Sequence, residues 1–177
     1  MKKILVKNWK CFLIAVIFGS LTACAMGGNV FHYSISFDAR RDSPEIEVID
    51  YRYSNGDVLI LYPEKERLRL GQVFHRADIY GELPRGDFLY VKWRVKATGE
   101  IFEDKVDLQK RLPADMEKLD INFVVHGPHL YVFVEWPWDG QPWQSEPNAT
   151  KYTPVPGGVK RYQGHKQVQI YPDQPKQ

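Results

Sequence analysis

The alternation of apolar and polar side chains along short segments constrains the fold of this chain more than any other feature of its sequence. Between residues 31 and 37, apolar side chains occupy every odd position and polar ones every even position: Phe31, Tyr33, Ile35 and Phe37 against His32, Ser34 and Ser36. Successive side chains of a strand point to opposite faces of the sheet, so this period of two predicts a strand with one buried face.

Two hairpins are predicted on the same basis. If Thr98-Gly99 forms a two-residue loop, the flanking strands pair apolar residues with one another and place Arg94 opposite Glu103. The predicted pairs are Val95 with Phe102, Val91 with Val106, Leu89 with Leu108 and, as the one poor pair, Trp93 with Asp104. A second hairpin is predicted to turn at Gly127-Pro128, with Val125 opposite Leu130 and Phe123 opposite Val132.

Most of the remaining segments are also predicted as short strands. The apolar phase slips by one residue between Val48 and Ile49, which indicates a β-bulge, and Asn55-Gly56 predicts a tight turn. Residues 65–70 fit a short helical turn or an exposed strand, 72–80 and 166–171 fit strands, and the apolar run 130–136 predicts a central strand buried on both faces. About eight short strands without a convincing helix predict an all-β fold, an antiparallel β-sandwich of about 7–9 strands with little helix.

The first 24 residues resemble an export signal with a lipidation site. The first ten contain four lysines and no acid, and an apolar run over 11–21 follows, which is shorter than the roughly 20 residues of a membrane-spanning helix. The run ends in Leu21-Thr22-Ala23-Cys24, so we expect the Cys24 thiol to carry a diacylglycerol after cleavage. The predicted organisation is a signal peptide over 1–23, a lipidated tether over 24–29, one β-sandwich domain over 30–172 and a polar tail over 173–177.

Removal of the signal changes the composition of the chain. The 24 basic residues less the four lysines of the signal leave 20, against 22 acidic residues, so the mature chain has a formal charge of −2. This balance argues against nucleic acid as a partner. Cys11 leaves with the signal and Cys24 is alkylated, so no cysteine remains for a disulfide. Ala25 is not the aspartate that favours inner-membrane retention, and the predicted location is the periplasmic side of the outer membrane.

No arrangement of residues in the sequence predicts catalysis. His126 and His129 flank a hairpin turn without a Cys or acidic residue placed nearby, which does not indicate a metal site. Asp42-Ser43-Pro44 lacks the pattern of a nucleophile elbow and is interpreted as a turn between strands. We therefore expect no enzyme, no metal, no small-molecule substrate and no cofactor beyond the covalent lipid on Cys24.

A tryptophan-rich stretch is the feature that packing explains least well. A proline-rich stretch of eight residues, 136–143, contains Trp136, Trp138 and Trp143, and also Asp139. The stretch either folds back to cap the open end of the sandwich or presents a binding surface, because partly exposed Trp is enriched in protein-binding hot spots. Our candidate partner-binding residues are Trp136, Trp138, Asp139, Trp143, Lys92, Arg94 and Glu103.

Three stretches resemble a family of small proteobacterial lipoproteins that are often encoded beside type VI secretion effectors. They are residues 41–53 (RDSPEIEVIDYRY), 91–100 (VKWRVKATGE) and 170–175 (IYPDQP). The resemblance spans most of the mature chain and supplies no site residues. It implies an immunity protein: a periplasm-facing lipoprotein that binds and neutralises a cognate toxin, such as a lipase or another envelope-acting effector. The alternative is an accessory lipoprotein of a secretion or assembly system.

Overall fold

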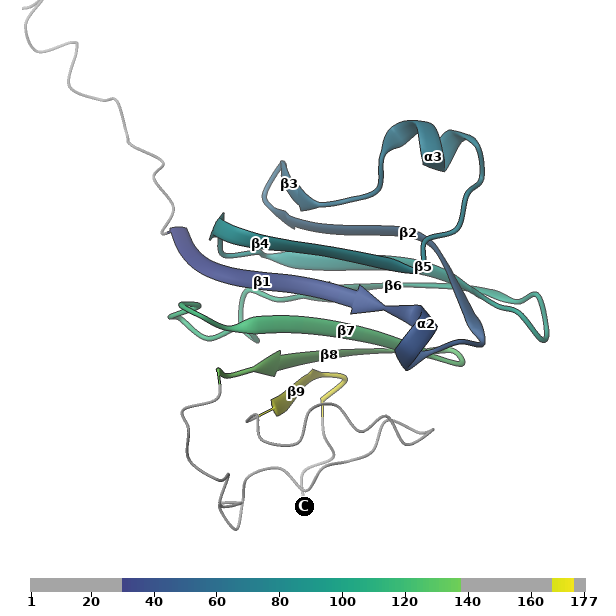
Figure 1. Ribbon diagram of the computed structural model, residues 1–177. Helices are drawn as coiled ribbons and strands as arrows, with labels where there is room; N and C mark the ends of the chain where they lie inside the picture. Colours follow the sequence, from purple (N-terminus) through teal and green to yellow (C-terminus); the bar gives the residue numbers. More distant parts are fainter. Residues whose placement is uncertain (1–29, 138–166, 174–177) are drawn as a thin grey trace, which may run out of the picture.

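The computed structural model describes residues 30–137 and 167–173, which form two β-sheets (Figure 1). The larger sheet has five strands in the order β4-β1-β7-β8-β9. Their bounds are β1 Val30–Asp38, β4 Arg76–Pro84, β7 Asp120–His126, β8 His129–Glu135 and β9 Gln167–Tyr171. All neighbouring strands of this sheet are antiparallel except β1 and β7, which run parallel through Ser34–Ser36 and Asp120–Asn122.

The smaller sheet has four antiparallel strands in the order β3-β2-β5-β6. Their bounds are β2 Ile46–Asn55, β3 Val58–Leu61, β5 Phe88–Val95 and β6 Ile101–Asp107. Two short helices complete the described part of the chain: α2 Ala39–Asp42, directly after β1, and α3 Lys65–Arg69. Two sheets with little helix confirm the predicted all-β sandwich, and α3 shows that residues 65–69 take the helical alternative.

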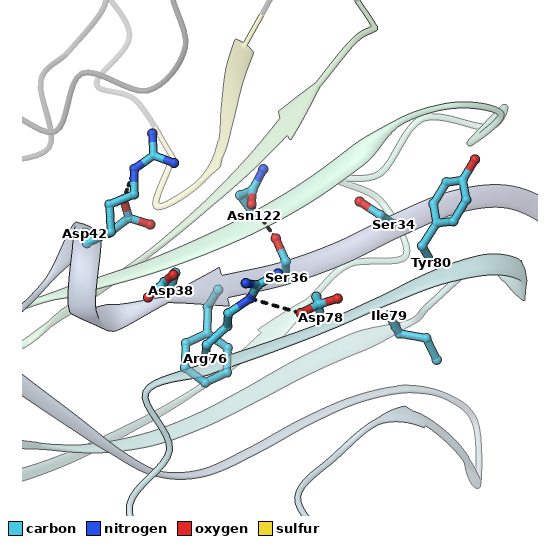
Figure 2. Close-up of a pocket in the computed structure, with 11 residues that line it drawn as sticks. Ser34, Ser36, Asp38, Asp42, Arg76, Asp78, Ile79, Tyr80 and Asn122 are labelled. Carbon is cyan, nitrogen blue, oxygen red and sulfur yellow. Dashed lines mark hydrogen bonds and ion pairs between the residues drawn. The ribbon is translucent and has the colours of Figure 1, made fainter.

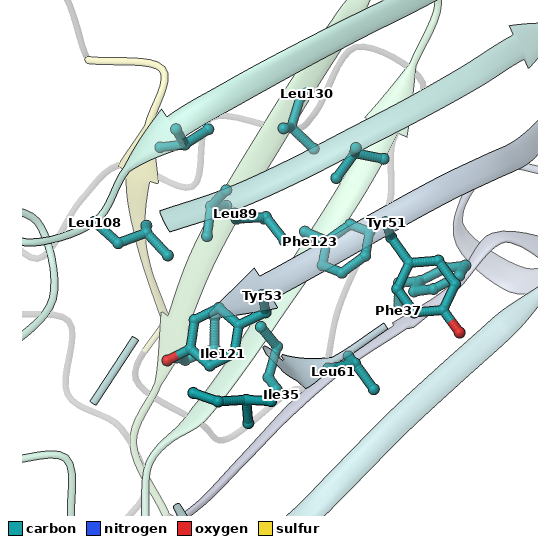
Figure 3. Packing of buried hydrophobic residues seen from close by; sticks show 14 of the residues in the cluster. Ile35, Phe37, Tyr51, Tyr53, Leu61, Leu89, Leu108, Ile121, Phe123 and Leu130 are labelled. Carbon is teal, nitrogen blue, oxygen red and sulfur yellow. The ribbon is translucent and has the colours of Figure 1, made fainter. Parts of the chain in front are cut away.

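The hydrophobic core lies between the two sheets. The inward positions of β1, which include Ile35 and Phe37, meet those of β7, including Phe123, and those of β2, including Tyr51 and Tyr53, in one buried cluster (Figure 3). These side chains are the apolar members of the alternating patterns, and burying them is the main favourable contribution to folding. The polar members of β1 consequently point to the outer face of the larger sheet.

The predicted pairing of β5 with β6 is wrong by two residues. The structure pairs Leu89 with Val106, Lys92 with Glu103 and Trp93 with Phe102, so Arg94 lies opposite Ile101 and not opposite Glu103, and Leu108 lies beyond the strand. Five residues, Lys96 to Glu100, join the two strands: the Val95 N–H donates to the Glu100 carbonyl, and Gly99 has a φ of +74°. A shift of two residues keeps every side chain on its predicted face and replaces the poor Trp93–Asp104 pair with an aromatic one.

Other local predictions are confirmed. The β7–β8 hairpin turns at Gly127-Pro128 with Val125 opposite Leu130 and Phe123 opposite Val132, and the register of β2 shifts between Val48 and Asp50, which places a bulge at Ile49. Strand β8 is buried on both faces, because Tyr131 and Phe133 form a second apolar cluster on the side away from the core. The turn predicted at 42–44 is partly helical, since α2 extends to Asp42.

Candidate functional site

A groove of about 310 Å³ crosses the outer face of the larger sheet (Figure 2). Its floor is β1, where Ser34 and Ser36 present two small side chains between β4 and β7. Ser34 donates a short hydrogen bond to Asp120, and the Ser36 hydroxyl donates to Asn122 Oδ1 at 2.7 Å. Small serines on the middle strand and larger side chains on its two neighbours create the depression.

The walls of the groove are lined by oppositely charged side chains. Asp38 accepts two hydrogen bonds from the Arg40 guanidinium, at 3.1 and 3.0 Å, and this contact lowers the pKa of the Asp38 carboxyl. Arg76 Nε lies 3.1 Å from Asp78 Oδ1 on β4. On α2, Arg41 Nε lies 4.0 Å from an oxygen of the nearly buried Asp42 carboxylate. Each carboxylate of the groove therefore lies within ion-pair distance of an arginine.

An exposed tyrosine lies at the end of the groove opposite α2 (Figure 2). The Tyr80 side chain is 68% exposed although it belongs to a nine-residue strand. Its ring contacts the His32 ring edge to face, with 4.4 Å between centroids and 89° between planes. This contact fixes the orientation of a large aromatic surface beside hydrogen-bonding groups.

Two carboxyl groups lie opposite each other on β7 and β8, on the outer face of the larger sheet. Asp120 on β7 and Glu135 on β8 are direct cross-strand partners, and Glu135 is only 3% exposed. Gln167 Nε2 donates to Glu135 Oε1 at 2.7 Å. Burial, helped by the negative charge of Asp120, raises the pKa of Glu135 to about 7, against the opposing effects of hydrogen bonds from Asn122 and Gln167 and the charge of Arg41.

Three of the predicted partner-binding residues share the outer face of the smaller sheet. Lys92, Arg94 and Glu103 project from β5 and β6, away from the core. Lys92 Nζ lies 3.6 Å from Glu103 Oε2, and Arg94 Nη1 lies 3.1 Å from Glu47 Oε2 on β2. The Tyr90 hydroxyl also donates to Glu103, at 2.9 Å, so the charged side chains form rows across three strands.

Of the three tryptophans in the 136–143 stretch, the structure describes only Trp136. Trp136 directly follows β8 in the larger sheet and packs partly buried against the core cluster, so it does not share a face with Lys92 and Arg94. Trp138, Asp139 and Trp143 lie outside the described residues, as do Cys24, the predicted signal over 1–23, the tether over 24–29 and residues 174–177. Asp173, predicted to begin the tail, accepts a hydrogen bond from Arg111.

Sequence reasoning did not identify the groove. The alternation in β1 correctly placed Ser34 and Ser36 on the outer face, but the depth of that face depends on the strands that flank β1. Neither β4 nor β7 is next to β1 in the sequence, and β7 joins it in parallel. Within residues 30–137 and 167–173, no group of three His, Cys, Asp or Glu side chains could hold a metal ion, and no helix is long and apolar enough to cross a membrane.

Comparison with known proteins gives no relative: no family model, no curated protein and no solved structure matches this chain. The resemblance to type VI-associated lipoproteins therefore stays a prediction.

Proposed function

We propose that this protein is a lipid-anchored immunity protein that binds and neutralises a toxin in the bacterial envelope. The observation that supports this proposal most is the charged outer face of the β3-β2-β5-β6 sheet. The side chains of Arg94, Lys92 and Glu103 are between 37% and 59% exposed on this face. They lie beside an ion pair on β2, in which Arg52 Nη2 is 2.7 Å from Asp50 Oδ2.

A charged sheet face suits recognition of another protein. Its strands are paired, so little backbone freedom is lost when a partner covers the face. Alternating charges favour a partner of complementary pattern and reject others, and they also accelerate association. A standard interface buries about 800 Å² on each partner, which one sheet of a domain of this length can supply.

The predicted anchor fits the same role. The first strand begins at Val30, so a lipid on Cys24 would hold the domain close to the membrane surface through residues 24–29. Confinement of inhibitor and toxin to one membrane-bounded layer raises their effective concentration.

The decisive experiment co-expresses the protein with the product of the neighbouring toxin gene and purifies one of them. We expect a stable one-to-one complex, and cells that lack the protein should be killed by the toxin of their siblings. Absence of a complex would contradict the proposal. A deletion that stops secretion without self-intoxication would instead support the accessory role.

Charge reversal locates the interface. Arg94→Glu should lower the affinity for the toxin at least tenfold, mainly through slower association at low salt. Arg69→Glu is the matched control, because Arg69 also forms an exposed ion pair, 2.7 Å from Glu66 on α3, away from this face. Equal effects of the two substitutions would show that the charged face is not the interface.

The anchor has its own test. Cys24→Ser should abolish labelling by a radioactive or alkyne-tagged fatty acid and leave the precursor uncleaved. Continued processing of this variant would contradict the lipoprotein assignment.

A further inference from the structure

We propose that the groove over β1 binds an uncharged saccharide of one or two sugar rings. This site is distinct from the charged face assigned above to the toxin, so the two proposals stand or fall separately. It also departs from the expectation, drawn from the sequence, that the chain takes no small molecule. A volume of about 310 Å³ lies at the small end of ligand pockets, which limits the occupant to a compact ligand.

The charges of the groove favour a neutral ligand. The three carboxylates of its lining, Asp38, Asp42 and Asp78, are matched by Arg40, Arg41 and Arg76, so their formal charges cancel. An anion would have to displace a carboxylate from its arginine, and a cation would have to displace an arginine from its carboxylate. A neutral ligand avoids this cost, because a paired carboxylate keeps lone pairs that can accept further hydrogen bonds.

The hydrogen-bonding groups of the groove match the chemistry of a sugar. Adjacent hydroxyls of a pyranose act as donors and acceptors at fixed spacing, and planar groups such as carboxylates, guanidinium groups and amides can bind two of them at once. Asp78 and Arg76 present such planar groups on one wall, beside a floor of serines on which Ser36 is already bonded to the buried Asn122 (Figure 2).

Tyr80 supplies the apolar contact that a sugar also needs. One face of a pyranose ring consists of C–H groups, which pack against aromatic rings. The Tyr80 ring is exposed at the end of the groove and oriented by His32. The edge-to-face contact with His32 orients the Tyr80 ring on the edge strand β4. This contact leaves most of the ring surface open to a ligand.

The test uses the full-length lipoprotein in a detergent without a sugar headgroup. Backbone amide shifts are followed by NMR during titration with N,N′-diacetylchitobiose or maltose, and separately with inorganic phosphate and a Lys-Arg dipeptide. We expect saturable shifts at Ser34, Ser36 and Tyr80 with at least one saccharide and weaker shifts with the charged compounds. Shifts confined to other surfaces, or tighter binding of phosphate or dipeptide to the groove, would overturn the proposal.

Two substitutions separate stacking from charge. Tyr80→Ala should weaken saccharide binding at least tenfold, whereas Tyr62→Ala, at a tyrosine that is 48% exposed outside the groove, should have no effect. Asp78→Asn leaves Arg76 without its carboxylate, so it should weaken the saccharide and strengthen phosphate. Glu66→Gln removes the partner of Arg69 on α3 and is the matched control. Unchanged binding in both groove variants, with unchanged melting temperatures, would also overturn the proposal.

Discussion

The hydroxyl groups of Tyr33 and Tyr53 lie 2.8 Å apart in the core and join the two sheets of the sandwich. The Tyr33 hydroxyl donates its only proton to the Pro84 carbonyl, at 2.6 Å. The Tyr53 hydroxyl must therefore donate the hydrogen bond to the Tyr33 oxygen. Tyr53 in turn accepts from the Gly86 N–H at 2.9 Å. The chain of hydrogen bonds thus leaves the 84–86 segment, crosses both sheets and returns to it, and burial raises the pKa of Tyr33 to about 12.

Tyr53→Phe should destabilise the protein by about 2 kcal/mol, because it removes two buried hydrogen bonds and leaves the Gly86 N–H without an acceptor. The double variant Tyr33→Phe/Tyr53→Phe should cost less than the sum of the two single changes, since the shared bond is lost only once. Urea denaturation gives the free energies of unfolding. Tyr62→Phe is the control, and its exposed hydroxyl should contribute less than about 0.5 kcal/mol. If the losses in unfolding free energy of the two single variants add up to that of the double variant, the two hydroxyls are not coupled by a shared hydrogen bond.

Gly86→Ala should destabilise the protein by about 3 kcal/mol. A β-carbon at Gly86 would overlap the Tyr53 ring and hydroxyl, which are buried and cannot move without displacing the core. Gly56→Ala is a useful comparison, because Gly56 has open space around it but a φ of +55°, so only backbone strain of about 1 kcal/mol is expected. Equal losses of stability by thermal unfolding would mean that steric overlap at Gly86 is unimportant.

The sequence predicted the strands well because their pattern is local. Alternation over a few residues decides which face of β1 or β5 is buried, and it needs no knowledge of the neighbouring strand. The register of β5 against β6 was missed because apolar side chains pair acceptably at two registers that differ by two residues. In the observed register Trp93 meets Phe102 while Asp104 lies opposite Val91, so the five-residue loop, with Gly99 at a φ of +74°, decides the question.

The groove could not be predicted for a different reason. It requires β4 and β7 to flank β1, and the parallel β1–β7 pair is a contact between segments more than 80 residues apart (Ser34 with Asp120). The buried Glu135 is similar: its position at the end of an apolar strand is visible in the sequence, but its pairing with Asp120 and Gln167 follows only from the order of strands.

Trp136→Ala should lower the free energy of unfolding by about 2 kcal/mol, because this side chain packs against the core and its removal leaves a partial cavity. Circular dichroism melting and toxin binding should be measured on the same preparation. Tyr62→Ala is the control for loss of an exposed aromatic side chain. Lost binding with an unchanged melting temperature would show that Trp136 belongs to an interface and does not act as a cap.

The buried carboxyl of Glu135 predicts how stability depends on pH. Its pKa rises from 4.5 in the unfolded chain to about 7 in the fold, so between these values the native state binds more protons than the unfolded state. Stability must therefore fall as pH rises through this window, by roughly 3 kcal/mol for this group. Glu135→Gln keeps the shape and can still bond to Gln167, so we expect it to be more stable than the parent at pH 8 and to lack most of this decline.

Asp120→Asn provides the second arm of the pH experiment. Removing the neighbouring negative charge should lower the pKa of Glu135 and shift the decline in stability toward lower pH without abolishing it. Urea denaturation at intervals between pH 4.5 and 8.5 measures both effects, with Glu100→Gln, an exposed carboxylate on the hairpin loop, as the control. If Glu135→Gln and the parent chain lose stability in parallel across this range, Glu135 is ionised throughout, and the buried carboxyl pair does not hold a proton near neutral pH.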